Sequence, residues 1–133
     1  MPGHTGREPG APVHFDDGLF AADLARQPER ARGALETARG RYECEGVPAS
    51  ERRHCDAEHP SGTRLPGCLK AYIPDFTGAW RIVFQIALLA EGKLGLEYVA
   101  LGVAHPRERS RQRSVYELAH YRLHGAWPRR PPR

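Results

Sequence analysis

Three apolar segments lie close together in the second half of the chain, and their spacing limits the folds that this sequence can adopt. They cover residues 69–73, 80–87 and 94–104, and their apolar side chains recur at every second position. A period of two is typical of β-strands. The connections "PDFTGA" and "EGK" are short and rich in turn-forming residues, as expected between antiparallel neighbours. The region therefore predicts an antiparallel meander, in which we expect Phe84, Val99 and Leu101 to be buried.

Helical patterns flank these strands on both sides. Residues 13–15 are a candidate short strand, after which Asp16 or Asp17 can cap a first helix that ends or kinks at Pro28. Residues 31–42 carry an apolar stripe at helical spacing. Ser114 can cap a last helix. A helical hairpin packed on an antiparallel sheet, with a C-terminal helix behind it, is an α+β domain.

The length of 133 residues is that of one domain. We expect a disordered segment at 1–12, a single domain at 13–125 and a basic Pro/Arg tail at 126–133. Residues 46–67 are polar and interrupted by Pro and Gly, so we interpret them as a loop insertion. The odd number of cysteines, three, fits a reducing compartment. Neither an export signal nor an apolar run of membrane-spanning length is found, so we expect a cytoplasmic protein with no membrane partner.

Cysteine and histidine side chains gather in and around the predicted 46–67 loop. These potential zinc ligands are Cys44, His54, Cys55, His59 and Cys68. Structural zinc sites use closely spaced ligand pairs, and this region contains no CxxC or HxxxH pair. We therefore expect neither a metal site nor a cofactor.

The pairing register of the first two strands decides which polar side chains share a face of the sheet. If Ile73 pairs with Trp80, then Tyr72 lies opposite Arg81, and Lys70 joins them on the same face. A slip of one residue would separate these side chains. Under the favoured register the sheet has an apolar face for the helices and a more polar, cationic face.

Basic and aromatic side chains follow the third strand. From His105 to the C-terminus the chain has eight arginines and two glutamates, whereas the whole chain has a net charge of +4. Such an uneven distribution favours a polyanionic partner. Arginine binds phosphate oxygens in pairs, histidine transfers protons near neutral pH, and tyrosine can stack on a base. These residue types suit metal-free RNA cleavage, in which a ribose 2′-hydroxyl attacks the phosphate.

Each of these residues also has a purely structural interpretation. Arg81 can form an ion pair, here with Glu97, and Lys70 can simply be solvated. Tyr116, at a helix start, can pack against the sheet, and His105 can cap the end of a strand. These alternatives stay open at the level of the sequence.

The segments "LKAYI", "GAWRIVFQI", "LEYVALGVAHPRERS" and "VYELAHYRL" together resemble the bacterial RelE/ParE superfamily of type II toxins. The resemblance covers residues 69–125, and the part before Tyr42 agrees in the order of its elements. It implies a compact RelE-like fold with an N-terminal helical hairpin, an antiparallel sheet and a C-terminal helix.

The resemblance also implies a role for each matching residue. Arg81 resembles the central-strand arginine that contacts the scissile phosphate, and Lys70 or Tyr72 resembles a lysine on the preceding strand. His105 or Arg107 resembles the basic residue after the last strand, and Tyr116 the aromatic residue that stacks on a base. The expected catalytic set is therefore Arg81, His105, Arg107 and Tyr116, and the expected nucleic-acid-binding set is Lys70, Tyr72, Arg109, Arg111 and Arg113.

The function implied is that of a toxin in a type II toxin–antitoxin system. Such a toxin would be a metal-independent endoribonuclease that cleaves mRNA, on the ribosome or free, and inhibits translation. Its protein partner would be an antitoxin encoded next to it. Two alternatives are a ParE-like gyrase inhibitor that cleaves nothing and a non-catalytic interaction module with the same fold. The presence of His105, Arg107 and Tyr116 favours the nuclease.

Overall fold

The computed structural model describes residues 10–55, 64–73, 79–106 and 112–128. Within these ranges the chain forms three α-helices and one five-stranded mixed sheet, which is the predicted α+β class. The order of the strands across the sheet is β1-β5-β4-β3-β2. The strands are β1 (Val13–His14), β2 (Arg52–His54), β3 (Cys68–Tyr72), β4 (Trp80–Leu88) and β5 (Leu94–Val103), and the helices are α1 (Asp17–Ala25), α2 (Glu29–Glu45) and α3 (Val115–His124).

The predicted meander is confirmed. Strands β3, β4 and β5 pair antiparallel in sequence order. The register is also the favoured one, because Tyr72 lies opposite Arg81 and the Ile73 amide donates to the Trp80 carbonyl oxygen at 3.3 Å. Phe84 and Leu101 are at most 1% exposed, and Val99 is 5% exposed, as expected for core positions.

The sheet is wider than the predicted meander and is not purely antiparallel. Strand β1, at the candidate position 13–15, pairs parallel with β5 through Leu96 and Glu97. Strand β2 pairs antiparallel with β3 and lies inside residues 46–67. The prediction of a loop throughout 46–67 is therefore wrong for the described residues 46–55, which also contain the 3₁₀ helix η1 (Ala49–Glu51). Charged side chains are typical of a solvated edge strand. Because β2 consists of Arg-Arg-His, it lacks the alternating apolar pattern by which a strand is recognised in the sequence.

The expected boundaries of the domain need correction at both ends. Ala11 exchanges backbone hydrogen bonds with Val47, and the Pro12 carbonyl accepts from the Leu96 amide at 2.8 Å. The ordered domain therefore begins before residue 13. At the other end, the ring of Trp127 stacks on Tyr121 with centroids 4.5 Å apart, so the start of the predicted tail packs on α3. Residues 1–9 and 129–133 lie outside the described residues.

The helices begin where the sequence predicts, but α1 ends at Ala25, before the expected limit at Pro28, which instead is the N-cap of α2. The Asp16 carboxylate accepts from the Leu19 amide at 2.9 Å and caps α1. The apolar stripe of α2, from Ala31 to Tyr42, is buried. Ser114 forms a capping box with Glu117 at the start of α3. None of the helices in the described ranges has the length and apolar composition needed to cross a membrane.

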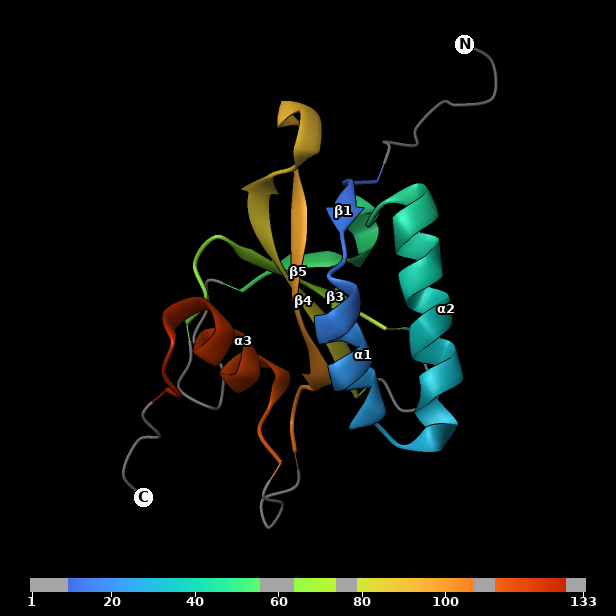
Figure 1. The fold of residues 1–133 in the computed structure, drawn as a ribbon, viewed down its shortest axis with the longest axis vertical. Coiled ribbons are helices and arrows are strands. Elements are labelled where there is room, and N and C mark those ends of the chain that lie inside the picture. The colour runs from blue at the N-terminus through green and yellow to red at the C-terminus, as the bar shows by residue number, and fades with distance from the viewer. Residues whose placement is uncertain (1–9, 56–63, 74–78, 107–111, 129–133) are drawn as a thin grey trace.

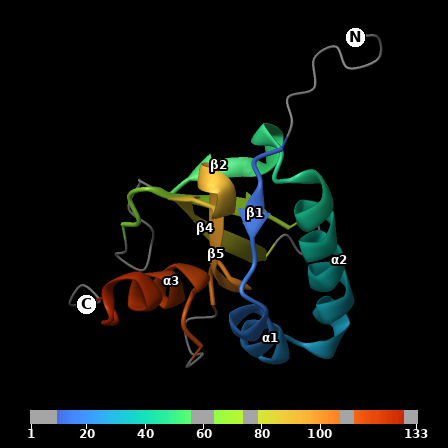
Figure 2. The same cartoon turned by 45° about the horizontal axis from the view of Figure 1, so that its top comes forward.

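The helices cover both faces of the sheet. Figures 1 and 2 show α1 and α2 on one side of the strands and α3 on the other. The core under α1 and α2 is aromatic, with Phe15 stacked on Tyr98 at 5.3 Å and edge-on to Phe84 at 5.9 Å. The core under α3 is smaller and includes Val83 and Tyr116. The chain therefore has three layers, with separate apolar contacts on each face of one sheet.

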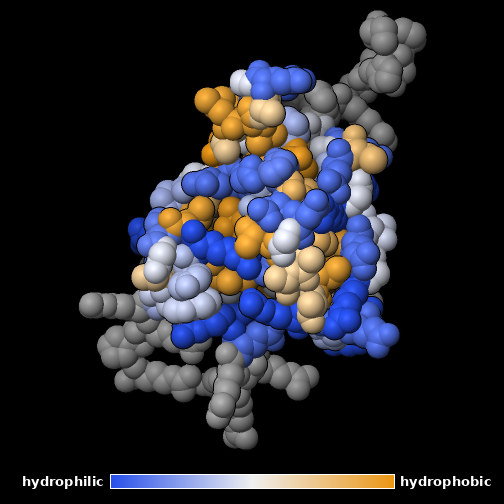
Figure 3. Space-filling view, viewed as in Figure 1, coloured by the Kyte–Doolittle hydropathy of each residue, from blue (hydrophilic) through white to orange (hydrophobic). Residues whose placement is uncertain are grey.

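The β4–β5 hairpin extends beyond these layers. Ile86, Leu88 and Leu94 are exposed on it, with Leu88 reaching 74%. Figure 3 shows apolar surface gathered at the end of the molecule where this hairpin lies. Clustered apolar exposure of this kind commonly marks a contact surface.

A buried ion pair joins the two helical layers at the edge of β5. The guanidinium of Arg122, on α3, makes two hydrogen bonds of 2.6 and 2.7 Å with the carboxylate of Asp23, on α1. The same carboxylate accepts from the Tyr98 hydroxyl at 2.5 Å and from the Leu101 amide at 3.3 Å, and Arg122 also donates to the Val99 carbonyl at 2.8 Å. Strand β1 pairs only with residues 96–97 of β5. The ion pair therefore provides hydrogen-bonding partners for the edge of β5 that β1 does not reach.

A second network fixes the end of α2 against the segment before β2. The Glu51 carboxylate accepts two hydrogen bonds from Arg41, at 2.8 and 2.5 Å, and one from the Tyr42 hydroxyl at 3.0 Å. The hydrogen bonds from Arg41 are the largest cause that lowers the pKa of Glu51. This network explains why a polar segment after α2 is ordered.

We predict that removing one partner of the Asp23–Arg122 pair is strongly destabilising. Arg122→Met leaves a fully buried carboxylate without its counter-charge, which costs about 3–5 kcal/mol in proteins. Urea unfolding of the variant should show a lower midpoint with an unchanged slope. The control is Asp17→Ala, which breaks an ion pair whose carboxylate is 89% exposed and should cost at most about 1 kcal/mol. Equal losses in the two variants would contradict this role.

We predict an acid-dependent contribution from Glu51. Because its pKa is lowered in the folded state, the ionised form stabilises the fold above the ordinary value of 4.5, and this contribution is lost as the pH falls through the lowered pKa. Glu51→Gln should therefore be less stable than the parent at pH 7, and the difference should shrink below about pH 4. Urea unfolding at both pH values measures it, and a pH-independent difference would contradict it.

Candidate functional site

Four of the predicted site residues converge on the face of the sheet that α3 covers. Lys70 comes from β3, Arg81 from β4 and Tyr116 from the first turn of α3, while Tyr72 lies at the end of β3. The Lys70 Nζ lies 5.9 Å from the ring centroid of Tyr72 and 5.2 Å from that of Tyr116. The Arg81 Cζ lies 3.8 Å from the Tyr72 centroid. We call these four residues the cationic–aromatic cluster.

Arg81 is held in place from several directions. Its guanidinium donates to the Trp80 carbonyl oxygen at 2.9 Å and lies over the ring of Tyr72. It is half-buried on a central strand. The alternative of an ion pair with Glu97 is wrong, because Glu97 lies opposite Gln85 and its carboxylate accepts from His14 at 2.7 Å. Arg81 therefore presents a fixed positive charge beside an aromatic ring.

The two tyrosines of the cluster differ in what they can do. Tyr72 is 46% exposed, so its ring is accessible to a ligand. Tyr116 is only 3% exposed and cannot stack on a base without a rearrangement of the core. Burial raises the pKa of Tyr116 to about 12, against the lowering effects of the Arg81 charge and of a hydrogen bond with Arg81. Tyr116 is therefore protonated at neutral pH and positions Arg81, rather than acting as a base.

His105 does not join this cluster. It is exposed after β5 and lines a cavity of about 640 Å³ together with Trp80 and Val103, which belong to the core under α1 and α2. Ala104, directly after β5, packs into the core under α3, whereas His105 lies beside Trp80 and Val103 on the other side of the sheet. The expected grouping of His105 with Arg81 and Tyr116 is therefore not formed in this structure.

Of the remaining predicted arginines, the structure describes Arg113 alone. Arg107, Arg109 and Arg111 lie outside the described residues. Arg113 forms an ion pair with Glu117 at 3.1 Å, and its Cζ lies 4.7 Å from the ring centroid of Trp127. Arg113 thus lies at the start of α3 and has structural partners of its own.

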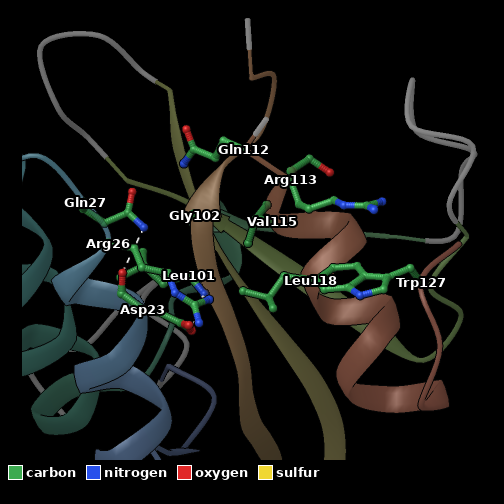
Figure 4. Close-up of a pocket in the computed structure, with 11 residues that line it drawn as sticks. Asp23, Arg26, Gln27, Leu101, Gly102, Gln112, Arg113, Val115, Leu118 and Trp127 are labelled. Carbon is green, nitrogen blue, oxygen red and sulfur yellow. Dashed lines mark hydrogen bonds between the residues drawn. The ribbon is translucent and has the colours of Figure 1, made fainter. Parts of the chain in front are cut away.

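A groove of about 480 Å³ lies between α1 and α3. Figure 4 shows Arg113 and Trp127 on one side, Asp23 and Arg26 on the other, and Leu101 between them. Sequence reasoning missed this groove, because its two walls come from segments about 90 residues apart that Asp23 and Arg122 bring together. It also missed Arg26, Arg30 and Arg32, whose only signal was a group of three arginines around Pro28.

The cysteines are distributed between surface and core. Cys44 is exposed on α2, whereas Cys55 and Cys68 are buried beside each other, with the Cys55 amide donating to the Cys68 carbonyl at 3.1 Å. Burial raises the pKa of the Cys68 thiol to about 11. Among the described residues, no three His, Cys, Asp or Glu side chains are placed to hold a metal ion. His59, the other residue considered for zinc, lies outside the described residues.

Comparisons with protein-family models, with curated proteins and with solved structures found no match for this chain.

We predict one fast-reacting thiol per chain. Cys44 is exposed, whereas the other two thiols are buried and Cys68 has a raised pKa, so both should react slowly while the protein is folded. Titration with a chromogenic disulfide reagent should show one thiol reacting quickly and all three reacting in denaturant. Cys44→Ser should abolish the fast phase. Fast reaction of a second thiol would show that the core under α3 opens readily.

Proposed function

We propose that this protein is a RelE-like toxin that binds and cleaves RNA without a metal ion. The observation that carries the proposal is the convergence of Lys70, Tyr72, Arg81 and Tyr116 from three separate elements. Two cations beside an accessible aromatic ring suit a phosphate with an adjoining base, because guanidinium binds phosphate oxygens and bases stack on aromatic rings. The proposed RelE-like fold is supported by the order β1, α1, α2, then a meander and α3.

The proposed reaction is an internal transesterification of RNA. The ribose 2′-oxygen attacks the phosphorus, the bond to the 5′-oxygen breaks, and a 2′,3′-cyclic phosphate and a 5′-hydroxyl are formed. Arg81 would stabilise the negative charge that develops on the phosphate, since its guanidinium is permanently charged and already oriented. The Lys70 ammonium would give a proton to the leaving 5′-oxygen, and the proton of the 2′-hydroxyl would pass to water. Tyr72 would stack on a neighbouring base.

His105 has no catalytic role in this proposal, in contrast to the expectation from the sequence. Since it lines a different cavity, it is not part of the proposed reaction centre. Arg107, which the resemblance also assigns to the catalytic set, lies outside the described residues, and its role stays a prediction.

The proposed partners follow from charge and exposed surface. The net charge of +4 and the basic C-terminal region support mRNA, free or on the ribosome, as the polyanionic substrate. The exposed apolar side chains of the β4–β5 hairpin, Ile86, Leu88 and Leu94, support a protein partner, which we propose to be an antitoxin encoded next to the toxin. We propose the cytoplasm as the compartment, because both partners are found there.

The second candidate is a RelE-fold protein that cleaves nothing, either a ParE-like gyrase inhibitor or an interaction module. Two observations favour it. His105 lies apart from Arg81, and the ring of Tyr116 is buried, so two of the four expected catalytic residues cannot contact RNA at the cluster.

We predict that expression without an antitoxin arrests growth and produces new RNA 5′-ends. Arg81→Gln should reduce cleavage by about 10²–10³, the usual cost of removing one oriented charge-stabilising donor. Tyr72→Ala should weaken RNA binding by about 1–3 kcal/mol through the lost stacking. Growth curves, mapping of RNA 5′-ends, and cleavage of a synthetic oligoribonucleotide by the purified chain measure these effects.

Two variants serve as controls for this prediction. Lys93→Ala removes an exposed cation on the turn between β4 and β5, outside the cluster, and it should cleave RNA as the parent does. His105→Ala should retain cleavage, because His105 is outside the cluster. Growth arrest with intact RNA and with inhibited gyrase would favour the ParE-like alternative, and arrest unchanged by Arg81→Gln would refute the proposed site.

A further inference from the structure

We propose that a cavity on the opposite face of the sheet binds a diphosphate group, as found in pyrophosphate and in nucleoside diphosphates. It is the cavity of about 640 Å³ that His105 lines, and we call it the arginine cavity after Arg26, Arg30 and Arg32. It is separate from the cationic–aromatic cluster, so the inference does not depend on the proposed RNA cleavage.

The cavity is formed where three parts of the chain meet. The end of α1 and the first turn of α2 form one wall, through Ala25 to Arg32. The start of β4 and the end of β5 form the other, through Trp80 and Val103, and His105 joins them two residues after Val103. Its volume lies within the range of about 300–1,000 Å³ that is usual for sites of small molecules.

The described lining of the cavity is strongly positive. The described lining contains three arginines and no aspartate or glutamate. Asp23, the buried carboxylate nearest in sequence, is already paired with Arg122. The neighbouring Glu29 is exposed and does not line the cavity. Guanidinium groups are suited to phosphate because they offer two parallel donors to its oxygens.

Two of the arginines are held by the surrounding structure. The Arg32 Nε donates to the Gln27 carbonyl at 3.0 Å, and its Nη2 donates to the Ala25 carbonyl at 3.1 Å. The Arg30 Cζ lies 5.8 Å from the ring centroid of Trp80. Side chains that are already positioned lose less entropy when they bind a ligand, which raises the affinity of the site.

Two helix ends meet at this cavity, and the carbonyls of Ala25 and Gln27 at the negative end of α1 already accept from Arg32. Helix α2 has 17 residues and begins at this cavity, and its N-cap Pro28 makes no side-chain capping hydrogen bond. The first amides of a helix and its dipole favour an anion at this position. Three arginines, a histidine and the start of α2 therefore border one open cavity, and the charge and several oxygens of phosphate suit these groups.

Isothermal titration calorimetry of the full chain with pyrophosphate, ADP and adenosine tests the proposal. Pyrophosphate and ADP should each bind at one site per chain, and adenosine should not bind, because the phosphates carry the recognition. Arg30→Gln and Arg26→Gln should each weaken binding at least about tenfold, the effect of losing one charged hydrogen bond. His105→Gln provides a variant outside the helices, with a smaller loss expected. Circular dichroism and thermal unfolding confirm that each variant is folded.

Arg81→Gln separates this site from the proposed RNA site. It should leave pyrophosphate binding unchanged, whereas it should impair RNA cleavage if the proposed function holds. The absence of saturable binding would overturn the proposal, as would binding that is insensitive to both Arg26→Gln and Arg30→Gln. Binding lost in Arg81→Gln alone would assign phosphate to the cationic–aromatic cluster and also overturn it.

Discussion

The buried pair of Asp23 and Arg122 is the interaction on which the arrangement of layers depends. Strand β5 lies between β1 and β4 in the sheet, but β1 covers only a short part of its outer edge. Beyond that point, the Asp23 carboxylate accepts a hydrogen bond from the Leu101 amide, and the Arg122 guanidinium donates one to the Val99 carbonyl. Because Asp23 belongs to α1 and Arg122 to α3, the same pair fixes the position of both helices. The groove of Figure 4 exists because these helices are held on either side of one strand edge.

The two faces of the sheet then separate the basic residues between two sites. Arg81 lies on the face covered by α3, where it contacts Tyr72. The adjacent Trp80 faces α1 and α2, and His105 lies on that side as well. Arg81 and His105, which the sequence analysis placed in one catalytic set, thus lie on opposite faces of the sheet. This division is the physical basis for proposing two separate phosphate sites, one for RNA and one for a diphosphate.

Burial changes the chemistry that the tyrosines and cysteines can perform. A phenol under a helix keeps its proton, and the raised pKa of Tyr116 makes it a hydrogen-bonding partner for Arg81. Tyr72 is exposed, so a ligand can reach its ring, whereas the ring of Tyr116 is buried. The same core holds Cys55 and Cys68 with little access to solvent. The proposed site therefore combines an accessible edge, formed by Tyr72 and Lys70, with a buried support that keeps Arg81 in position.

Local sequence patterns alone determined the helices, the three central strands and the register that brings Lys70, Tyr72 and Arg81 together. Capping residues and a period of two act over a few positions, so they can be recognised in a single chain. The edge strand β2, the Asp23–Arg122 pair and the arginine cavity were decided by the tertiary structure. Each of them joins segments that are distant in sequence, and no local pattern specifies which distant charge, edge or helix start a residue will meet.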